Sequence, residues 1–336
     1  HSVPVIADAY LKGFRNFDQA LMFEAITNTL TVAHPGKPKE NWDLYDKCGY
    51  FPCDVIRGES VSRCLECSYD DWCAAKYMEA TGHAKEADFF LKRAQNWKNV
   101  FDSSIGFGRG KTSKGDWREP FDPYAFGHGA ENDNDFTEGN AFQYSWHVMQ
   151  DVDGLVAAMG GRTKAVERLD ALFTAKGLMG GAPVDISGMI GQYVHGNEPS
   201  HHVIYFYPQL GHPEKAAERI RDVFDTQYHV GPEGLCGNDD CGQMSAWYVF
   251  SAMGFYPFNP CGGEYVIGAP QLPRATIAFA NGRRFTVVAK GLSKANKYVK
   301  SVTLNGRPLA GRTLRHADVT AGGELVFEMT RLPRER

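Results

Sequence analysis

Hydrophobic residues recur at two different spacings along this chain, and the change between them divides it into two parts. Up to about residue 260 they follow the period of an amphipathic helix. The segments with this period, for which we predict helices, span residues 5–30, 60–79, 86–101, 138–158, 162–176, 200–210, 213–229 and 242–254. We therefore expect a helical region that occupies most of the chain.

From about residue 263 the spacing changes to two, which is typical of strands that bury one face. Apolar or alternating runs begin at Tyr265, Thr276, Phe285, Val299 and Leu325. Asn281-Gly282 and Asn305-Gly306 are dipeptides favoured in two-residue hairpin turns. The last part of the chain is therefore predicted to be a small antiparallel β unit.

Residues 103–137 follow neither period and are rich in Gly, Asp, Asn and Pro, which indicates a functional or mobile segment rather than a plain connector. Helices of similar length joined by polar loops favour an α/α toroid, a ring of helical hairpins; a complete (α/α)6 ring needs about twelve helices. We predict a mainly α fold: residues 1–260 form part of an (α/α)6 toroid barrel, and residues 261–336 form a β-rich terminal segment packed on it.

Composition excludes some classes of function. The 336 residues are 43% hydrophobic and 23% charged, which is ordinary for a globular protein with a sizeable core. A net charge of −4 without any basic stripe argues against a nucleic-acid partner, and no apolar run approaches the length of a membrane span. The start at His1 runs straight into a helical pattern without a signal peptide, so we expect the interior of a longer protein or a processed chain.

The chain has eight cysteines, five of them within residues 48–73. In an oxidising compartment they could close disulfides, with Cys48–Cys53 and Cys236–Cys241 as the shortest candidate loops. Residues 64–67 have the Cys-x-x-Cys spacing of zinc ligands, but no second matched pair accompanies them and they lie in a helical stretch. We expect a secreted or periplasmic protein, with the cysteine pairing left open.

Three polar strings place carboxylates at the starts of predicted helices. They are Thr137-Glu138-Gly139-Asn140, Gly196-Asn197-Glu198-Pro199 and Gly237-Asn238-Asp239-Asp240. Each acid alone is explained as a helix cap or a solvated loop, because a helix N-terminus stabilises negative charge. Three such strings between apolar segments instead favour carboxylates that converge in one cavity, as acid–base chemistry or a hard cation requires.

Further residues refine this picture. Asn197 and Glu198 offer oxygen ligands, which suit Ca²⁺ far better than zinc. The adjacent acids Asp70 and Asp71 beside Trp72 allow two interpretations, a solvent-facing helix surface or a platform on which a sugar ring stacks. No phosphate-binding glycine loop, nucleophile elbow or catalytic Cys/His signature occurs, so paired carboxylates at a toroid mouth indicate glycoside hydrolysis.

These strings resemble those of glycoside hydrolase family 92, and the resemblance covers essentially the whole chain. The motifs that carry it begin at Gly58 (Gly-Glu-Ser-Val-Ser-Arg), Asp70 (Asp-Asp-Trp), Glu138 (Glu-Gly-Asn-Ala-Phe-Gln-Tyr), His195 (His-Gly-Asn-Glu-Pro-Ser-His-His) and Gly237 (Gly-Asn-Asp-Asp-Cys-Gly-Gln-Met-Ser-Ala-Trp-Tyr). Members of that family are Ca²⁺-dependent, inverting, exo-acting α-mannosidases in which a β-sandwich precedes an (α/α)6 barrel. The resemblance implies the second half of the barrel with its terminal β segment. Its partner would be the missing N-terminal half, without which we expect the chain not to fold.

The resemblance also implies roles for single residues. Glu138 would be the general acid and Asp240 the general base, with Asn238 where some relatives carry a second acid. Asn197 and Glu198 would help to hold Ca²⁺, which grips the O2 and O3 hydroxyls of mannose. The implied substrate contacts, or residues that support them, are Asp70, Asp71, Trp72, His201, His202 and Gln243.

Three positions depart from the family pattern: Phe142 stands for a frequent Trp, Gln150 for a His, and Gly196 for an acid found in some relatives that act on α-1,2 linkages. Retention of Glu138 favours an ordinary glycosidic bond over a phosphodiester-linked mannose. We expect an inverting exo-α-mannosidase whose substrate is a mannose-containing glycan. The alternatives are a non-catalytic carbohydrate-binding protein, which has no use for an acid–base pair, and an inverting toroid glycosidase acting on glucosides, which would not require Ca²⁺.

Overall fold

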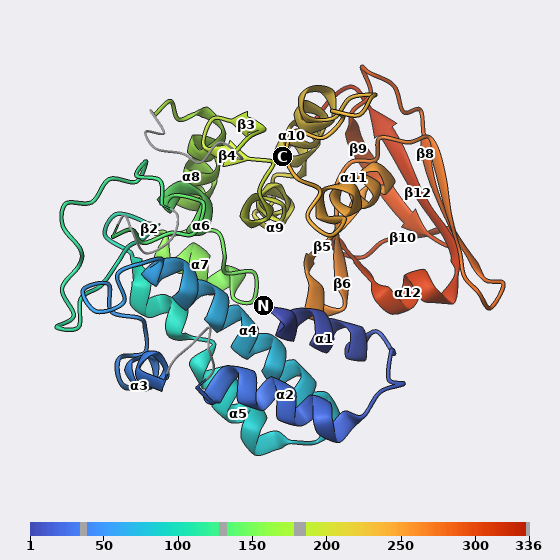
Figure 1. The fold of residues 1–336 in the computed structure, drawn as a ribbon. Coiled ribbons are helices and arrows are strands. Elements are labelled where there is room, and N and C mark those ends of the chain that lie inside the picture. The colour runs from blue at the N-terminus through green and yellow to red at the C-terminus, as the bar shows by residue number, and fades with distance from the viewer. Residues whose placement is uncertain (34–38, 128–132, 178–185, 334–336) are drawn as a thin grey trace. The chain divides into compact units, whose positions relative to one another are not determined.

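The computed structural model describes residues 1–33, 39–127, 133–177 and 186–333, and Figure 1 shows their helices and strands. The chain divides into two compact units, His1–Val184 with Gly191–Tyr193 and Asp185–Ile190 with Val194–Arg336. The first unit is mostly helical, and the second combines helices with the larger sheets. The prediction of a mainly helical chain with a β-rich end is confirmed.

In the first unit, helices pack around one long, largely buried helix, α4 (Ser60–Thr81). This helix ends at Gly82, which has a left-handed backbone conformation. The other elements described are α1 (Ser2–Leu11), α2 (Gln19–Thr31), α3 (Lys39–Cys48), α5 (Ala84–Arg93), η1 (Asn96–Val100), β1 (Phe101–Asp102), β2 (Phe107–Gly108), α6 (Ala141–Tyr144), α7 (Val152–Ala158) and α8 (Arg162–Thr174). The helices predicted at 60–79 and 162–176 are confirmed.

Several predicted helices of this unit are broken in the structure. The segment 5–30 forms α1 and α2, because Gly13 takes a φ of +95° and the Asp18 side chain caps α2 through the backbone amides of Ala20 and Leu21. The segment 86–101 is likewise divided between α5 and η1, and 138–158 between α6 and α7. Helix α3 was not predicted.

The second unit contains two sheets with the strand orders β10-β9-β12-β8-β7 and β11-β6-β5. Its elements are β3 (Met189–Ile190), β4 (Tyr193–Val194, which begins in the first unit), η3 (Glu198–Ser200), η4 (Val203–Tyr205), α9 (Phe206–Gln209), α10 (Pro213–Gln227), α11 (Gln243–Met253), β5 (Phe255–Asn259), η5 (Pro260–Gly262), β6 (Glu264–Ile267), β7 (Arg274–Ala278), β8 (Arg284–Lys290), β9 (Tyr298–Leu304), β10 (Arg307–Pro308), β11 (Thr313–Arg315), α12 (His316–Ala321) and β12 (Gly323–Thr330). The helices at 213–229 and 242–254 and the predicted strands are confirmed, whereas the helix predicted at 200–210 is divided into the short helices η4 and α9.

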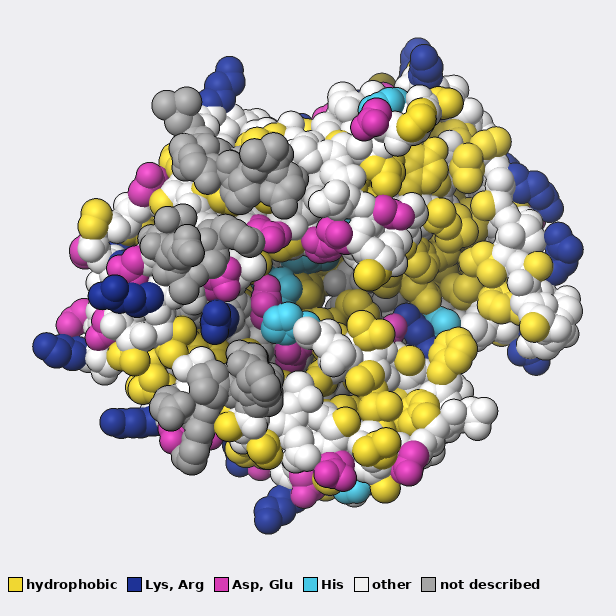
Figure 2. All heavy atoms as spheres, viewed as in Figure 1, with side chains coloured by type: hydrophobic (Ala, Val, Ile, Leu, Met, Phe, Trp, Pro, Cys, Tyr) yellow, Lys and Arg dark blue, Asp and Glu magenta, His cyan; other side chains and the backbone are white. Residues whose placement is uncertain are grey.

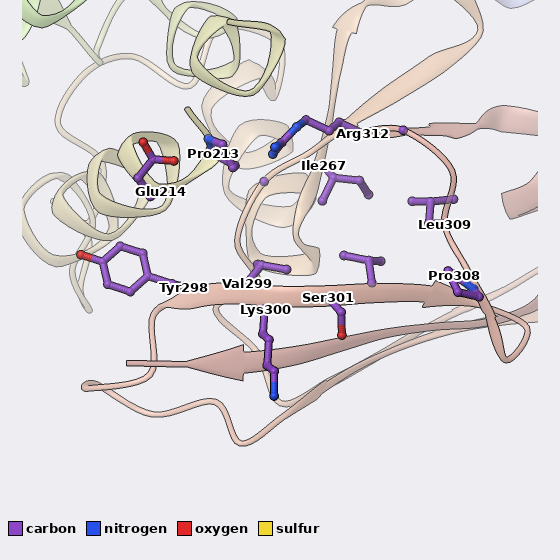
Figure 3. A pocket seen from close by; sticks show the side chains of 13 residues that line it. Pro213, Glu214, Ile267, Tyr298, Val299, Lys300, Ser301, Pro308, Leu309 and Arg312 are labelled. Atoms are coloured by element: carbon purple, nitrogen blue, oxygen red, sulfur yellow. The ribbon is translucent and has the colours of Figure 1, made fainter. Parts of the chain in front are cut away.

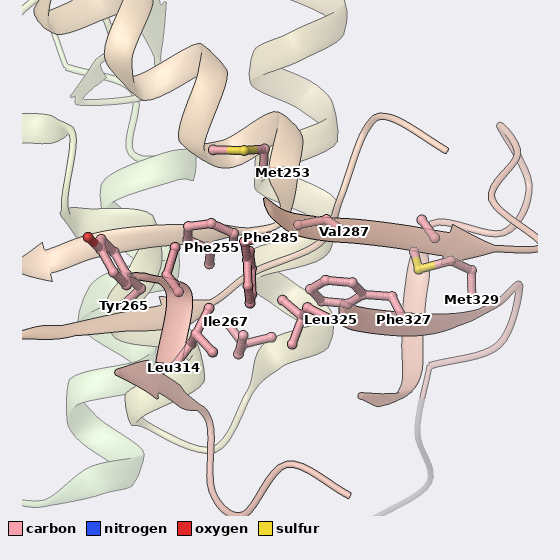
Figure 4. Packing of buried hydrophobic residues seen from close by; sticks show 12 residues of the cluster. Met253, Phe255, Tyr265, Ile267, Phe285, Val287, Leu314, Leu325, Phe327 and Met329 are labelled. Carbon is pink, nitrogen blue, oxygen red and sulfur yellow. The ribbon is translucent and has the colours of Figure 1, made fainter. Parts of the chain in front are cut away.

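A hydrophobic core joins the two sheets to the end of α11 (Figure 4). Phe255, Phe285 and Phe327 are fully buried in it, and Met253 reaches it from α11. Both predicted hairpin turns are present, between β7 and β8 and between β9 and β10. The β unit is not wholly antiparallel, because β12 returns after α12 and pairs in parallel with β8.

All eight cysteines lie among the described residues, and none of them forms a disulfide, so the disulfide expectation is not met. Five of them are buried and serve as small apolar side chains: Cys53, Cys64, Cys67, Cys73 and Cys261. In the described part of the chain, no helix combines the length and hydrophobicity that crossing a membrane requires.

Candidate functional site

Glu138 belongs to the first unit and lies two residues before Asn140, the N-cap of α6. Its φ of +47° is in the left-handed region, which costs a non-glycine residue on the order of 1–3 kcal/mol and is often found at functional sites. The Asn140 side chain accepts from the amides of Phe142 and Gln143, and Gln143 accepts in return from the Asn140 amide. This capping box fixes the backbone just after Glu138.

Helix α4 holds the segment 135–144, which we call the Glu138 loop, at three further points. The Ser62 hydroxyl accepts from the Thr137 amide at 2.8 Å, and the Ser60 hydroxyl donates to Asp135 at 2.9 Å. Tyr144 donates to Glu66 at 3.1 Å. Ser60 and Ser62 belong to the motif that begins at Gly58, but no role was predicted for them or for Glu66. The signal for a positioning role is a polar residue at intervals along a helix whose other positions are mostly buried.

His1 forms a charged cluster with two carboxylates of α4. Its Nδ1 lies 2.6 Å from Asp70 and its Nε2 2.7 Å from Glu66. Burial opposes the charged imidazole, but the hydrogen bonds and charges of both carboxylates outweigh it and raise the pKa of His1 to about 11. Burial also favours neutral Glu66, yet the hydrogen bond and charge of His1 lower the pKa of that carboxyl. The Asp70 carboxylate is thus buried and already hydrogen-bonded to His1.

Asp71 is an ion-pair partner rather than a sugar contact. It is fully buried, and Arg93 donates to its two oxygens at 2.8 and 2.6 Å while also donating to the Leu30 carbonyl at 2.8 Å. The solvent-facing interpretation of Asp70 and Asp71 is wrong, and so is the expectation that Asp71 contacts substrate, because both of its oxygens are bound in the interior. Trp72 is partly exposed and stacks on Tyr69.

In the second unit the structure brings two of the predicted strings together. We call residues 194–200 the Glu198 loop and residues 236–242 the Asp240 loop. A Cβ atom added to Gly237 would lie 2.8 Å from the Gly196 Cα, and one added to Gly196 would lie 2.8 Å from the Ser187 carbonyl oxygen. Because neither glycine has a side chain, the two loops touch backbone to backbone at this point.

The two adjacent acids of the Asp240 loop have different environments. Asp239 accepts from the Ser245 amide at 2.9 Å and so caps the first turn of α11. Asp240 is exposed and has a φ of +42°, and its carboxylate makes no hydrogen bond or ion pair with any other described residue. The structure therefore leaves Asp240, rather than Asp239, available for chemistry, with Asn238 exposed beside it.

Asn197 is buried in extended backbone, and Glu198 follows it as the first residue of η3, with Pro199 at the next position. Both side chains carry the oxygen donors that Ca²⁺ prefers, so the type of ligand fits. Their number does not complete a site: Ca²⁺ takes about 6–8 oxygens, and no group of three His, Cys, Asp or Glu side chains among the described residues could hold a metal.

A buried network lies behind these two loops. The His201 Nε2 lies 2.8 Å from the His195 carbonyl oxygen, and its Nδ1 lies 3.3 Å from the Gln243 amide nitrogen. Burial lowers the pKa of His201 to about 4, which keeps the ring neutral near pH 7. His201 is therefore placed to support the Glu198 loop rather than to contact substrate. His202 is also buried, against Phe206 and Phe258.

Figure 3 shows a cavity of the second unit that is separate from the predicted site residues. It encloses about 410 Å³ between the start of α10 and strand β9. Its walls include Ile267, Val299 and Leu309, with Glu214 and Arg312 at one side. Because no predicted acid, base or metal ligand lines it, this cavity is not the candidate active site.

A comparison with models of protein families matches residues 1–331 to the model described as the glycosyl hydrolase family 92 catalytic domain. Among curated proteins, an uncharacterized secreted glycosidase of Arthroderma benhamiae is 28% identical over 97% of this chain. This chain spans 44% of that relative's length.

Solved structures give the same result. A family GH92 α-mannosidase from Bacteroides thetaiotaomicron, in complex with mannoimidazole, superposes with a TM-score of 0.92 at 39% identity, over 99% of this chain and 44% of its own. A GH92 inverting mannosidase from the same species superposes with a TM-score of 0.87 at 34% identity, over 99% of this chain and 46% of its own. The chain is thus similar to less than half of each of these enzymes.

Proposed function

Because this chain belongs to glycoside hydrolase family 92, we propose that the protein containing it is an inverting exo-α-mannosidase that removes terminal α-mannose from glycans. The observation that carries the proposal is the family match over residues 1–331, together with two solved relatives above 30% identity that are mannosidases. The environments of the acidic residues within each unit support the assignment of roles.

Glu138 would protonate the leaving glycosidic oxygen, and Asp240 would take a proton from the attacking water. Both have left-handed backbone, and the capping box and α4 hold the Glu138 loop on either side of the acid. Asp240 has no competing partner among the described residues, whereas Asp239 is bound to the start of α11. An inverting enzyme separates its two carboxyls by about 6.5–9.5 Å to admit water, which the neighbours Asp239 and Asp240 could not do with each other.

Asn197 and Glu198 would supply part of the ligand shell of a Ca²⁺ ion. When bound, the ion would supply a positive charge at the O2 and O3 hydroxyls of mannose and favour a flattened ring. The contact between Gly196 and Gly237 would keep these ligands beside the Asp240 loop, and His201 with Gln243 would support them from the interior. Asp70 and Trp72 would lie in the sugar site only as weaker contacts, because Asp70 is already bound to His1.

The wider setting belongs to the same proposal. Residues 1–260 would form part of an (α/α)6 barrel and residues 261–336 its terminal segment, and the rest of the barrel and a β-sandwich would come from sequence outside this chain. We propose a secreted or periplasmic location, supported by the secreted glycosidase among the relatives.

The acid assignment is tested in the full-length enzyme with Glu138→Gln. Release of mannose from α-mannobiose should be lost, while binding of the disaccharide, measured by calorimetry, should survive because glutamine keeps the shape of the side chain. Near-normal turnover would refute the assignment. If this single substitution abolishes catalysis while binding is retained, the protein is an enzyme and not a purely carbohydrate-binding protein.

The base assignment has a matched control in the neighbouring acid. Asp240→Asn should abolish hydrolysis with little effect on the melting temperature. Asp239→Asn keeps an oxygen that can accept from the Ser245 amide, so it should leave both the melting temperature and most of the activity unchanged. NMR should show β-mannose as the first product of the parent enzyme, since inversion of an α-linkage gives the β-anomer. Seeing α-mannose first would indicate retention and a different mechanism.

The metal assignment is tested by chelation. EDTA should abolish mannose release by the parent enzyme, and added Ca²⁺ should restore it. In Glu198→Gln, added Ca²⁺ should not restore mannose release. Activity that persists in EDTA would instead favour an inverting toroid glycosidase with another substrate. The same assay on a panel of linkage-defined mannobioses and glucosides would identify the linkage.

A further inference from the structure

A second hollow lies on the first unit, between the segment that joins β1 to β2 and the side of α8. It encloses about 410 Å³, within the range of pockets that hold small molecules. Its polar lining consists of Ser103 and Ser104 from the joining segment and Lys164, Glu167 and Arg168 from α8. None of these residues belongs to the site predicted from the sequence.

The charged groups of this hollow are not neutralised within the part of the chain that the structure describes. Lys164, Glu167 and Arg168 lie close together along α8, yet they form no ion pair with one another or with other described residues. Arg168 instead donates to the carbonyl of Ile105, and its guanidinium carbon lies 4.3 Å from the centroid of the Phe107 ring. Burial lowers the pKa of Arg168.

Two glycines make room for the cations. A Cβ atom added to Gly106, whose φ is +70°, would lie 3.2 Å from the Arg168 Nε. One added to Gly160, whose φ is +90°, would lie 2.9 Å from the Lys164 Cδ. Both long side chains therefore lie across bare backbone at the hollow, and Arg168 is held there by the Ile105 carbonyl and the Phe107 ring.

We propose that this hollow binds the phosphate group of a phosphorylated sugar. Arg168 and Lys164 would bind the phosphate oxygens through charge-assisted hydrogen bonds. The Ser103 hydroxyl, which makes no hydrogen bond with the described residues, would add a donor. Glu167 would accept a hydrogen bond from a sugar hydroxyl, a contact that inorganic phosphate does not offer. The carboxylate beside two cations is thus the reason to expect a sugar phosphate rather than a bare ion.

The test is calorimetric titration of the full-length protein with mannose 6-phosphate, inorganic phosphate and a phosphorylated oligomannose. Mannose 6-phosphate should bind more tightly than inorganic phosphate, and Arg168→Gln and Lys164→Gln should each weaken it by about tenfold, the effect of losing one charge-assisted hydrogen bond. Lys85→Gln, an exposed cation on α5, is the matched control and should have no effect. If the phosphorylated oligomannose binds more tightly than mannose 6-phosphate, the natural ligand is a phosphorylated glycan. If the two bind with equal affinity, it is a free sugar phosphate.

Equal affinity in the parent and in Lys164→Gln would overturn the proposal. Lys164 is exposed, so this variant remains informative if Arg168→Gln fails to fold. If inorganic phosphate binds as tightly as mannose 6-phosphate, and Glu167→Gln does not change the affinity for the sugar phosphate, the hollow binds an adventitious ion only. That result would also overturn the proposal. Hydrolysis of a neutral mannoside should be unchanged in Lys164→Gln, so failure here leaves the proposed glycosidase activity standing.

Discussion

At the scale of single residues, buried charge decides which acids serve the fold. The Asp71–Arg93 pair is almost completely shielded from water, whereas the Lys92–Asp88 pair on the next helix is exposed. A buried charge left without its partner costs far more than an exposed one. Loss of one partner should therefore cost far more stability in the Asp71–Arg93 pair than in the Lys92–Asp88 pair.

Asp71→Asn should lower the free energy of unfolding by about 3–5 kcal/mol, because Arg93 would remain buried without a counter-charge. Asp88→Asn, the matched exposed control, should change it by less than about 0.5 kcal/mol. Urea unfolding of the full-length protein measures both. Equal effects of the two substitutions would show that the burial of Asp71 has no energetic consequence.

The His1 cluster gives stability a defined dependence on pH. The groups that face His1 are Glu66 and Asp70 from α4. Tyr144 of α6 is bound to Glu66, and the half-buried His147 lies close enough for its charge to interact with those of both carboxylates. Since folding raises the pKa of His1 from 6.5 to about 11, its contribution is fully present below pH 6.5 and is lost as pH rises toward 11.

The difference in unfolding free energy between the parent protein and His1→Gln should therefore be largest near pH 6 and should shrink steadily by pH 10. Chemical denaturation of both proteins across that range measures it. A difference that grows with rising pH would contradict the assigned charge state. Below pH 4.5 the contribution of Glu66 also declines, since its pKa is lowered in the fold.

At the scale of elements, one helix determines where the proposed acid stands. The first turns of α4 carry Ser60 and Ser62, and both hold backbone or side-chain groups that precede Glu138. Glu66, further along the same helix, holds Tyr144 on the other side of that acid. Helix α4 is therefore a positioning element for Glu138, although it contributes no reacting group.

Ser62→Ala should lower kcat by about fivefold with little change in KM, because the Thr137 amide loses an acceptor worth about 1 kcal/mol and Glu138 follows it in the chain. Ser68→Ala removes an equally buried hydroxyl from the same helix, one that donates to the Cys64 carbonyl, and should leave kcat unchanged. Steady-state kinetics on α-mannobiose compares the two. Equal losses in both variants would assign Ser62 to helix stability alone.

The elements that could be predicted from the sequence are those with a long hydrophobic period and those set by a short turn sequence. Helix α4 and the turn at Asn305-Gly306 are of this kind, since periodicity and two left-handed residues specify them directly. The break between α1 and α2 depends on Gly13 and on the Asp18 cap. The apolar periodicity continues across both, so the pattern alone predicts a single helix. The parallel pairing of β12 with β8 is a long-range choice that no local spacing reveals.

The candidate site was predictable in its residue types but not in the division of labour between neighbours. Asp239 and Asp240 look alike in the sequence, and only the hydrogen bond from Ser245 separates a cap from an uncommitted carboxylate. Asp71 was placed wrongly because its partner Arg93 lies on another helix. Such pairings are set by tertiary packing, which spacing along the chain does not encode.

At the scale of the whole molecule, α11 presents an apolar face. Tyr248 and Val249 are exposed on it, and they border a hollow of about 580 Å³ lined by Phe224, Leu235 and other residues. Figure 2 shows hydrophobic side chains gathered over the region of α11 and the neighbouring strands. An exposed apolar patch of this kind often marks a surface that another part of the protein or a partner covers. Because the chain spans less than half of its relatives, we expect sequence outside it to cover this face.

Val249→Asp should therefore destabilise the full-length protein. It should lower the melting temperature, measured by differential scanning fluorimetry, because it buries a charge. An unchanged melting temperature in the full-length protein would mean that the face stays in water.

The contact between Gly196 and Gly237 also constrains how this protein can diversify. A side chain at either position collides with the backbone of the other loop or with Ser187, so neither glycine can be exchanged while its neighbour stays in place. Directed evolution that randomises position 196 alone should return glycine. Libraries that vary 187, 196 and 237 together are the route to a new preference, and natural homologues should show these three positions changing in concert.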